Sequence, residues 1–399
     1  MLVPKPHSWI ELDATAFNHN INIYRNIIGK NTILCVALKS DAYGHGIKQM
    51  GKICQENDTV DWICTASLSE ALILRNENII KPILVLSLID EDPALALTHA
   101  IDLPVFDLST AELLNEIGRK HNKKFSIHIK IDSGMSRFGF IAQEGLEPVQ
   151  HIARLPFISI NGIYTHCAES GNPEQSFTLK QLHAFDLICQ QIEQAGIHIP
   201  FRHASNSAAA STVHPLFASN FIRLGAGTYG LWHFRNSPEE HPNLNLKSVM
   251  TWKTRVCHIK KVPANTFIGY DRTYQTTRET IIATIPVGYY DGYDRRFTNQ
   301  GIMKINDYYA KVVGRICMNA TKLEIPEGHT VSLGDEVILL GDHDNLRAHD
   351  LAKTIHSFNA REITTRLSPH LERRIVNEVT VVNSLQKNQL SKKPKMYAE

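Results

Sequence analysis

Lys39 stands at the end of an apolar run and shortly before a glycine-rich turn. Residues 33–38 are apolar, and Tyr43-Gly44-His45-Gly46 follows the lysine. A lysine at a strand end can simply extend its ammonium group into water. It can instead be held in a pocket, where its amine reacts with a carbonyl group as a Schiff base. This stretch alone leaves both roles open.

Polar side chains also accompany several later apolar runs. Arg137, His166 and Arg223 each lie in or soon after such a run. If the runs are parallel strands of one barrel, their carboxyl ends meet at one rim, where barrel enzymes place their active sites. The side chains expected at that rim are Lys39, Tyr43, Lys130, Arg137, His166, Asn206, Ser207 and Arg223.

The stretch from Gly225 to Gly230, GAGTYG, matches the glycine pattern of dinucleotide-binding turns. That pattern belongs early in a nucleotide-binding unit, with an acidic residue about 20 residues later at the end of a second strand. Here it closes the alternating part of the chain, which argues against a dinucleotide site. The loops after strands 7 and 8 of a barrel commonly bind phosphate instead. The backbone N–H groups of Ser207, Gly225 and Ala226 are therefore expected to form a phosphate cradle.

A phosphate cradle that faces a strand-end lysine indicates pyridoxal phosphate. This cofactor needs a lysine for its aldimine, a phosphate grip and a protein group at its pyridine nitrogen. Arg223, two residues before Gly225, can lie near that nitrogen. Because an arginine stays charged, it would keep the nitrogen unprotonated, which favours loss and return of a proton with few side reactions. An ion pair at the barrel rim is the alternative role of Arg223.

The elements that must position these residues follow a simple order. Strict alternation of strands and helices favours a parallel sheet with helices outside, and eight units fit a (β/α)8 barrel better than an open sheet. Periodicity also predicts a helix capped by Asp13, with the apolar face Phe17, Ile21, Tyr24 and Ile28. The eight apolar runs are 33–38, 61–66, 82–88, 102–107, 125–131, 158–165, 201–205 and 221–224.

After residue 242 the pattern changes to short β-like runs separated by turn residues, which is typical of a mainly β domain. The fold class predicted is therefore α/β, a (β/α)8 TIM-like barrel with a second, mainly β C-terminal domain. The barrel, which would bind pyridoxal phosphate, is expected over 8–241. The β domain is expected over 242–383 and a tail over 384–399.

Composition and charge narrow the class of protein. The apolar and charged fractions, 43% and 21%, are ordinary for a globular chain. A net charge of +2 gives no electrostatic case for binding nucleic acid or a membrane surface. The seven cysteines show neither metal-ligand spacing nor a disulfide framework, so no metal is expected and a reducing compartment is favoured. Without a signal peptide or an apolar run of about 18 residues, a cytoplasmic location is expected.

Taken in order, these stretches resemble the alanine racemase family over nearly the whole chain, from Trp9 to about Arg373. The stretch VALKSDAYGHG resembles the cofactor-lysine motif of that family. A series of further blocks in the same order is not explained by chance. These blocks are KIDSGMSRFGF (130–140), YTHCAES (164–170), HASNSAA (203–209), RLGAGTYG (223–230), IGYDRTY (268–274), IPVGYYDGYDRR (285–296) and VGRICMN (313–319).

The resemblance implies an amino-acid racemase that interconverts L- and D-alanine on a pyridoxal phosphate aldimine and supplies D-alanine for peptidoglycan. Lys39 would form the aldimine and act as the base on the D face. Arg137 would bond the phenolic oxygen of the cofactor, and Lys130 would be the lysine that the family carbamylates to hold that arginine. Arg223 would lie at the pyridine nitrogen, supported by His166. The phosphate ligands would be Tyr43, Asn206, Ser207, Gly225 and Ala226.

The resemblance also implies a head-to-tail homodimer in which each site takes residues from both subunits. Tyr270 of the second subunit would be the opposite-face base, and Met318 would bind the substrate carboxylate together with Arg137. Two bases suit racemisation, because a proton leaves one face and another returns to the other. Both pKa values must be lowered, which a cationic neighbour would do. The entrance would be shaped by Tyr289, Arg295 and Arg315.

Two departures from the family pattern concern the substrate. Asn319 stands where the family usually has an aspartate, and the segment 367–373 lacks the usual Val-Pro-Arg, with Pro369 where some members place an entrance tyrosine. A serine or broad-specificity amino-acid racemase of the same fold is therefore the alternative. Decarboxylation of a basic amino acid would need an acidic partner at the pyridine nitrogen, and Arg223 argues against it.

Overall fold

Eight parallel strands form one sheet that nearly closes into a barrel, in the order β10-β2-β3-β4-β5-β6-β8-β9. At the seam between β9 and β10, the backbone N–H of Arg223 donates to the carbonyl oxygen of Ser205 at 3.0 Å. Each predicted apolar run overlaps one of these strands, so the predicted barrel is confirmed. The strands are β2 (Ile33–Ala37), β3 (Trp62–Ser67), β4 (Ile83–Leu88), β5 (Ile101–Val105), β6 (Phe125–Asp132), β8 (Ile158–Tyr164), β9 (Phe201–His203) and β10 (Phe221–Leu224).

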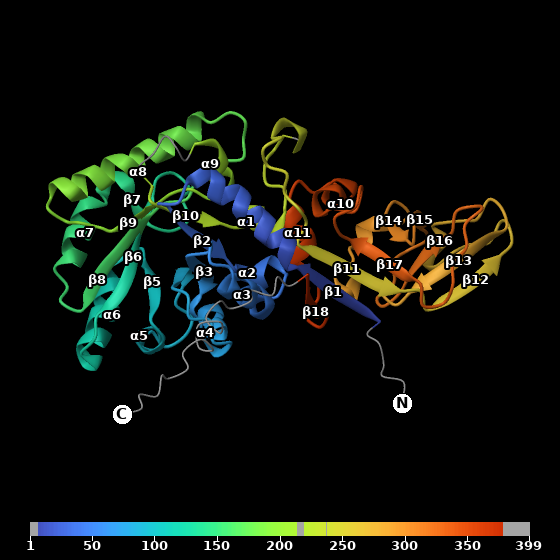
Figure 1. The fold of residues 1–399 in the computed structure, drawn as a ribbon, viewed down its shortest axis with the longest axis horizontal. Coiled ribbons are helices and arrows are strands. Elements are labelled where there is room, and N and C mark those ends of the chain that lie inside the picture. The colour runs from blue at the N-terminus through green and yellow to red at the C-terminus, as the bar shows by residue number, and fades with distance from the viewer. Residues whose placement is uncertain (1–6, 214–218, 237, 378–399) are drawn as a thin grey trace, which may run out of the picture.

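The computed structural model describes residues 7–213, 219–236 and 238–377, so the predicted tail lies outside the described residues. Helices surround the barrel, as the left half of Figure 1 shows. They are α1 (Ala14–Ile28), α3 (Ile47–Glu56), α4 (Leu68–Asn76), α5 (Ala94–His99), α6 (Leu108–His121), α7 (Leu146–Ala153), α8 (Ser176–Gln194) and the short α9 (Ser207–Thr212).

The first helix shows why the sequence folds as predicted. The side chain of Asp13 accepts a hydrogen bond from the N–H of Ala16 at 2.9 Å, which caps α1. The predicted apolar face is buried, with Phe17, Ile21 and Tyr24 fully enclosed. Within the described residues, no helix combines the length and apolarity that crossing a membrane requires.

A second sheet forms the other domain, on the right of Figure 1, in the order β12-β13-β16-β15-β14-β17-β11-β1-β18. Strand β7 (Phe140–Ile141) pairs with β6 in the barrel domain and belongs to neither path. The second sheet confirms the predicted mainly β domain. Its strands after β1 are β11 (Met250–Arg255), β12 (His258–Val262), β13 (Thr280–Ile285), β14 (Ile302–Ile305), β15 (Tyr308–Val312), β16 (Thr321–Glu324), β17 (Glu336–Leu340) and β18 (Glu372–Val376).

The predicted domain boundary assigned residues from 8 onward to the barrel, but the strand β1 (Ser8–Asp13) lies in the other domain. It pairs antiparallel with β11 and parallel with β18, so it belongs to the second sheet. The chain therefore begins in one domain, crosses into the barrel at α1 and returns after β10. Trp9, Ile10 and Leu12 are buried by this pairing, which joins segments far apart in the sequence.

Two helices near the end of the chain pack against each other, and the second of them contacts the barrel domain. They are α10 (Ala348–Thr354) and α11 (Ala360–Thr365), and Figure 1 shows α11 where the two domains meet. The close approach is seen at Gly44 in the barrel domain. A Cβ on that glycine would lie 2.0 Å from the carbonyl oxygen of Thr364 in α11.

Candidate active site

A cavity of about 1120 Å³ opens at the carboxyl-terminal ends of the barrel strands. It brings together every residue that sequence analysis expected at this rim, from strands β2, β6, β8, β9 and β10 or the loops after them. The predicted residues that line it are Lys39, Tyr43, Lys130, Arg137, His166, Asn206, Ser207, Arg223, Gly225 and Ala226.

Lys39 begins a one-turn segment, α2 (Lys39–Tyr43), whose backbone is left-handed. Ser40, Asp41, Ala42 and Tyr43 have φ values of 55, 52, 52 and 58°. Left-handed helical geometry costs about 1–2 kcal/mol per residue for ordinary side chains. The N–H of Ala42 donates to the carbonyl oxygen of Leu38 at 2.8 Å, so the turn is hydrogen-bonded internally. Four such residues in succession need support from their surroundings.

Burial lowers the pKa of Lys39, and the guanidinium groups of Arg137 and Arg361 lower it further. The amine is thus held closer to its neutral, nucleophilic form than a free lysine. Burial raises the pKa of Tyr43 to about 12, so its phenol stays protonated and can donate a hydrogen bond. The Lys39 ammonium lies 5.9 Å from the centre of the Tyr43 ring.

The segments after β9 and β10 lie against each other beneath Tyr43. The Oγ atom of Ser207 accepts hydrogen bonds from the N–H groups of Gly225 at 2.9 Å and Gly227 at 3.3 Å. A Cβ on Gly225 would lie 2.3 Å from the Tyr43 hydroxyl, so only glycine admits that hydroxyl. Asn206 caps α9 by accepting from the N–H groups of Ala208 and Ala209. The N–H of Gly225, expected to be free for phosphate, is therefore bonded to Ser207.

Arg223 on β10 is buried and makes four hydrogen bonds. Its guanidinium donates to Nδ1 of His203 at 2.6 Å and to the carbonyl oxygens of His203 at 2.9 Å and Thr165 at 2.6 Å. It also donates to the carbonyl oxygen of Ala204 at 3.3 Å. The resemblance gave the supporting position to His166, whereas the side chain that bonds Arg223 in this structure is His203. His203 precedes Arg223 on the neighbouring strand, where its ring can reach across the barrel seam.

The support for Arg223 continues through the barrel interior. Nε2 of His203 lies 2.7 Å from Nδ1 of His128, and Nε2 of His128 lies 3.2 Å from a carboxylate oxygen of Asp102. A guanidinium only donates, so His203 accepts at Nδ1 and carries its hydrogen on Nε2. Burial lowers the pKa of both histidines, which keeps them neutral. Each group therefore donates to the next one, in the order Arg223, His203, His128 and the Asp102 carboxylate.

Lys130 and Arg137 come from β6 and the loop after it. Burial lowers the pKa of Lys130 well below its usual range, and Arg223 and Arg137 lower it further. The ammonium lies 4.6 Å from the centre of the Tyr164 ring. The loop is shaped by Asp132, whose Oδ1 accepts from three consecutive N–H groups, those of residues 134, 135 and 136, at 2.8, 2.8 and 3.1 Å.

The cavity as a whole is cationic. Burial and the charges of Arg223, Lys130 and Lys39 hold the pKa of His166 well below its usual value. The one carboxylate among the described lining residues is Glu169, whose Oε2 lies 3.7 Å from the Arg235 guanidinium. Such a site favours an anionic ligand, because uncompensated buried cations are costly.

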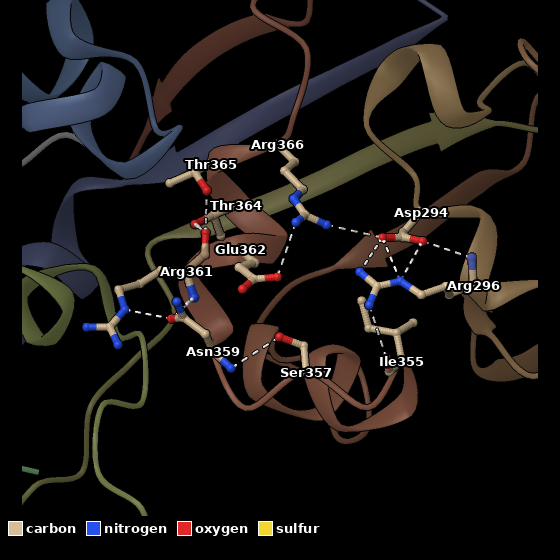
Figure 2. A network of polar contacts seen from close by, with 10 residues as sticks. All are labelled: Asp294, Arg296, Ile355, Ser357, Asn359, Arg361, Glu362, Thr364, Thr365 and Arg366. Carbon is tan, nitrogen blue, oxygen red and sulfur yellow. Dashed lines mark hydrogen bonds and ion pairs between the residues drawn. The ribbon is translucent and has the colours of Figure 1, made fainter.

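Three lining residues come from the second domain, and sequence analysis missed them: Phe358, Arg361 and Thr365. Figure 2 shows how α11 is held there. The Arg366 guanidinium lies 3.3 Å from Glu362 and 3.5 Å from Asp294, and Arg361 points to the opposite side. Pro369, expected near the entrance, is absent from the described lining residues. No sequence motif marks Phe358, Arg361 and Thr365, because they reach the cavity only through the fold of the β domain.

The predicted residues of the β domain lie elsewhere in the same chain. None of Tyr270, Met318, Tyr289, Arg295 and Arg315 is among the described residues that line the cavity. Tyr270, Met318 and Tyr289 are 69, 53 and 42% exposed. The Arg295 guanidinium lies 5.8 Å from the Tyr289 ring centre, and Arg315 pairs with Asp271 at 2.5 Å. The cavity of a single chain thus gathers the residues predicted in the barrel and none of these five from the β domain.

Comparisons with known proteins agree on one family. The family "Alanine racemase, N-terminal domain" matches residues 12–232, and "Alanine racemase, C-terminal domain" matches 249–375. The alanine racemase of Methanococcus maripaludis is 37% identical over 335 residues, which is 84% of this chain and 88% of that protein. That of Clostridium perfringens is 34% identical over 355 residues, covering 88% of this chain and 91% of that protein.

Solved structures give the same picture. The alanine racemase of Clostridium difficile 630 matches with a TM-score of 0.87 at 31% identity, covering 94% of this chain and 98% of that one. The histidine racemase of Leuconostoc mesenteroides matches with a TM-score of 0.84 at 23% identity, covering 94% of this chain and 99% of that one. At that identity the likeness extends to the fold alone.

Proposed function

This chain belongs to the alanine racemase family and is an isomerase of that type, and we propose that it interconverts L- and D-alanine with pyridoxal phosphate in the barrel cavity. The observation that carries the proposal is the meeting of Lys39, Tyr43 and Arg223 in one cationic cavity.

The residues present fit pyridoxal phosphate. Tyr43, Ser207 and Gly225 lie together in the cavity wall, where the missing Cβ of Gly225 admits the Tyr43 hydroxyl, and this small polar corner suits a phosphate group. The cations around it suit the charge of that group and of a substrate carboxylate. When bound, the cofactor withdraws electrons from the amino acid and makes its Cα–H acidic.

Each side chain then has a defined task. Lys39 would hold the cofactor covalently through its aldehyde carbon. Tyr43, Asn206, Ser207 and the backbone of Ala226 would bind the phosphate, and Gly225, whose N–H donates to Ser207, would lie beside it. Arg137 would bond the phenolic oxygen, and His166 would lie beside the ring. Arg223 is held in place by its hydrogen bond to His203. Its guanidinium would donate to the ring nitrogen and keep that nitrogen unprotonated.

Two bases would move the proton. Lys39 acts on one face of Cα, and its lowered pKa supports this role, because a larger fraction of the amine is neutral. Tyr270 would act on the other face from a second copy of the chain, since it is exposed and lies outside its own cavity. Met318 would reach the substrate carboxylate from the same copy, and Tyr289, Arg295 and Arg315 would shape the entrance.

Lys130 would be carbamylated. Its lowered pKa favours the neutral amine that reacts with carbon dioxide. The product is an anion, which would pair with Arg137 and relieve the excess of positive charge in this part of the cavity. The supply of D-alanine for peptidoglycan and a cytoplasmic location complete the proposal.

The alternative, a serine or broad-specificity racemase, rests on Asn319. This residue is exposed next to Met318 and lacks the negative charge expected at its position. Assays with single enantiomers of alanine and of serine decide between the two. Turnover of serine at a rate equal to that of alanine would favour the alternative.

The cofactor and the two bases are tested separately. The visible absorbance of bound pyridoxal phosphate is expected in the natural protein and should be lost in Lys39→Ala. In deuterated water, Tyr270→Phe should lose racemisation but still exchange the α-hydrogen of D-alanine through Lys39. Tyr309→Phe, which removes an exposed hydroxyl bonded to the carbonyl oxygen of Asp344, is the control. Equal exchange of both enantiomers by Tyr270→Phe would contradict the two-base scheme.

A further inference from the structure

The left-handed turn that carries Lys39 is packed against the end of the β domain. Gly44 and Gly46, which close the turn, have no room for a side chain on that side. A Cβ on Gly44 would lie 2.0 Å from the carbonyl oxygen of Thr364, and one on Gly46 would lie 2.5 Å from Cδ of Arg373. The turn and the segment 364–373 therefore fit directly against each other.

Arg373 on β18 makes the polar contact across this junction. Its Nε and Nη2 atoms donate to the carbonyl oxygen of Gly44 at 3.2 and 3.0 Å. Its Nη1 donates to the carbonyl oxygen of Leu371 at 2.9 Å, which fixes the guanidinium in place. The side chain is only 5% exposed, and Asp41 lies 3.7 Å from Nη2. A buried arginine thus donates twice to one carbonyl oxygen of the turn.

The other supports of the turn come from the barrel domain itself. Oδ1 of Asp41 accepts from the N–H of Ile47 at 2.7 Å and ties the turn to the start of α3. The N–H of Ser40 donates to Oε1 of Glu70 at 2.5 Å, on α4. Ser40 and Asp41, which had no expected role in the chemistry, therefore anchor one side of the turn. Arg373 anchors the other side from the second domain.

We propose that Arg373 is a positioning residue, which holds the left-handed turn through the Gly44 carbonyl and so aims Lys39 and Tyr43 into the cavity. The β domain would then serve its own barrel as well as a second copy. The proposal rests on the proposed function, in which Lys39 and Tyr43 hold the cofactor.

The next residue on β18 provides a matched control. The Arg374 guanidinium is more exposed and pairs with Glu372 of its own strand at 2.8 and 2.9 Å. Exchanging either arginine for glutamine makes the same chemical change on the same strand. Only Arg373→Gln removes the donors to Gly44.

The test compares Arg373→Gln, Arg374→Gln and the natural protein in three measurements. Hydrogen exchange without cofactor should show faster exchange in residues 39–46 of Arg373→Gln, where the N–H groups of Ala42, Gly44 and Gly46 bond within the turn. Pyridoxal phosphate should bind Arg373→Gln about tenfold more weakly or worse, which corresponds to about 1.4 kcal/mol. At saturating cofactor, kcat should fall while KM for alanine changes little. Arg374→Gln should match the natural protein.

Arg373→Lys keeps the charge but has one donor group, so it should give an intermediate effect on exchange and affinity. This variant carries the test if Arg373→Gln does not fold, and a lysine variant equal to the natural protein would then overturn the proposal. Equal behaviour of Arg373→Gln and Arg374→Gln would also overturn it. Faster exchange over the whole barrel would overturn the proposal too, because it would show that Arg373 stabilises the contact between the domains rather than the turn. If the natural protein binds no pyridoxal phosphate, the proposed function fails, whereas the exchange result still judges the anchoring of the turn.

Discussion

At the scale of single residues, the cavity is defined by cations that have few carboxylates beside them. Lys39, Lys130 and Arg223 share one buried region, and each lowers the pKa of its cationic neighbours or of His166. The charge excess has two consequences: it attracts an anionic ligand, and it favours the neutral form of the Lys39 amine.

Removing a cation that lies near Lys39 should raise the pKa of its amine. The Arg361 guanidinium lowers that pKa, so in Arg361→Gln the amine should hold its proton to a higher pH. The pH profile for capture of pyridoxal phosphate by the cofactor-free protein should therefore move to the alkaline side. Arg119→Gln, on the exposed face of α6, should leave the profile unchanged. A shift toward acid in Arg361→Gln would contradict this account of Lys39.

The chain of donors behind Arg223 makes a second prediction at this scale. Both His128 and His203 should be neutral at pH 7, with the hydrogen on Nε2, because Arg223 can only donate to His203. Nitrogen-15 NMR of histidine-labelled protein distinguishes the two tautomers. Asp102→Leu removes the last acceptor and should alter the signals of these two rings while leaving exposed histidines unchanged. A hydrogen found on Nδ1 of His203 would rule out the direction inferred.

Most of the barrel residues that line the cavity could be predicted from the sequence, because apolar runs mark where the strands end. Lys39, Arg137 and Arg223 stand at or near the ends of apolar runs, and parallel strands bring such ends together. The partner of Arg223 could not be predicted, because His166 lies just after β8 and His203 ends β9, and only the pairing at the barrel seam decides between them. Arg361 was missed for a similar reason, since its approach depends on how α11 meets the barrel.

At the scale of elements, the left-handed turn is the feature that sequence patterns hide. Left-handed backbone normally signals itself through glycine or asparagine, yet the turn consists of Ser40, Asp41, Ala42 and Tyr43. Its geometry is supported by contacts from α3, which follows it directly, and from α4 and β18, which lie farther along the chain. The same limit applies to β1, which pairs with β11 and β18 across more than half of the sequence.

Packing against this turn should make Gly44 far less replaceable than a glycine of similar backbone. Gly196 has φ 79° at the end of α8, where the N–H of Ile197 donates to the carbonyl oxygen of Ile192 as in a left-handed helix end. A Cβ added there would meet nothing within 4 Å, so Gly196→Ala should cost about 1 kcal/mol. Gly44, with φ 82°, meets the Thr364 carbonyl, so Gly44→Ala should cost roughly 3 kcal/mol or more. Urea unfolding of both variants measures the difference. Equal losses would mean that α11 moves aside at little cost.

At the scale of the whole molecule, one chain holds its two sets of predicted site residues in different places. The barrel cavity holds Lys39, whereas the β domain exposes Tyr270 and Met318 on a different part of the same chain. Phe358, at the cavity wall, is fully exposed as well. Exposed aromatic and apolar side chains beside a functional cavity are typical of surfaces that another protein covers. A second copy would cover them and supply the missing base.

Shared sites make a quantitative prediction for mixed subunits. Lys39→Ala and Tyr270→Phe should each be inactive in racemisation, because each lacks one base at both sites. After the two are unfolded together and refolded, half of the dimers pair unlike chains, and one site in each of these has both Lys39 and Tyr270. Activity should therefore return to roughly a quarter of that of the natural protein, by random pairing in a twofold dimer. A mixture of Lys39→Ala with Lys39→Met should stay inactive. Failure of the first mixture to regain activity would place both bases in one chain, and would require the β domain to turn toward its own barrel.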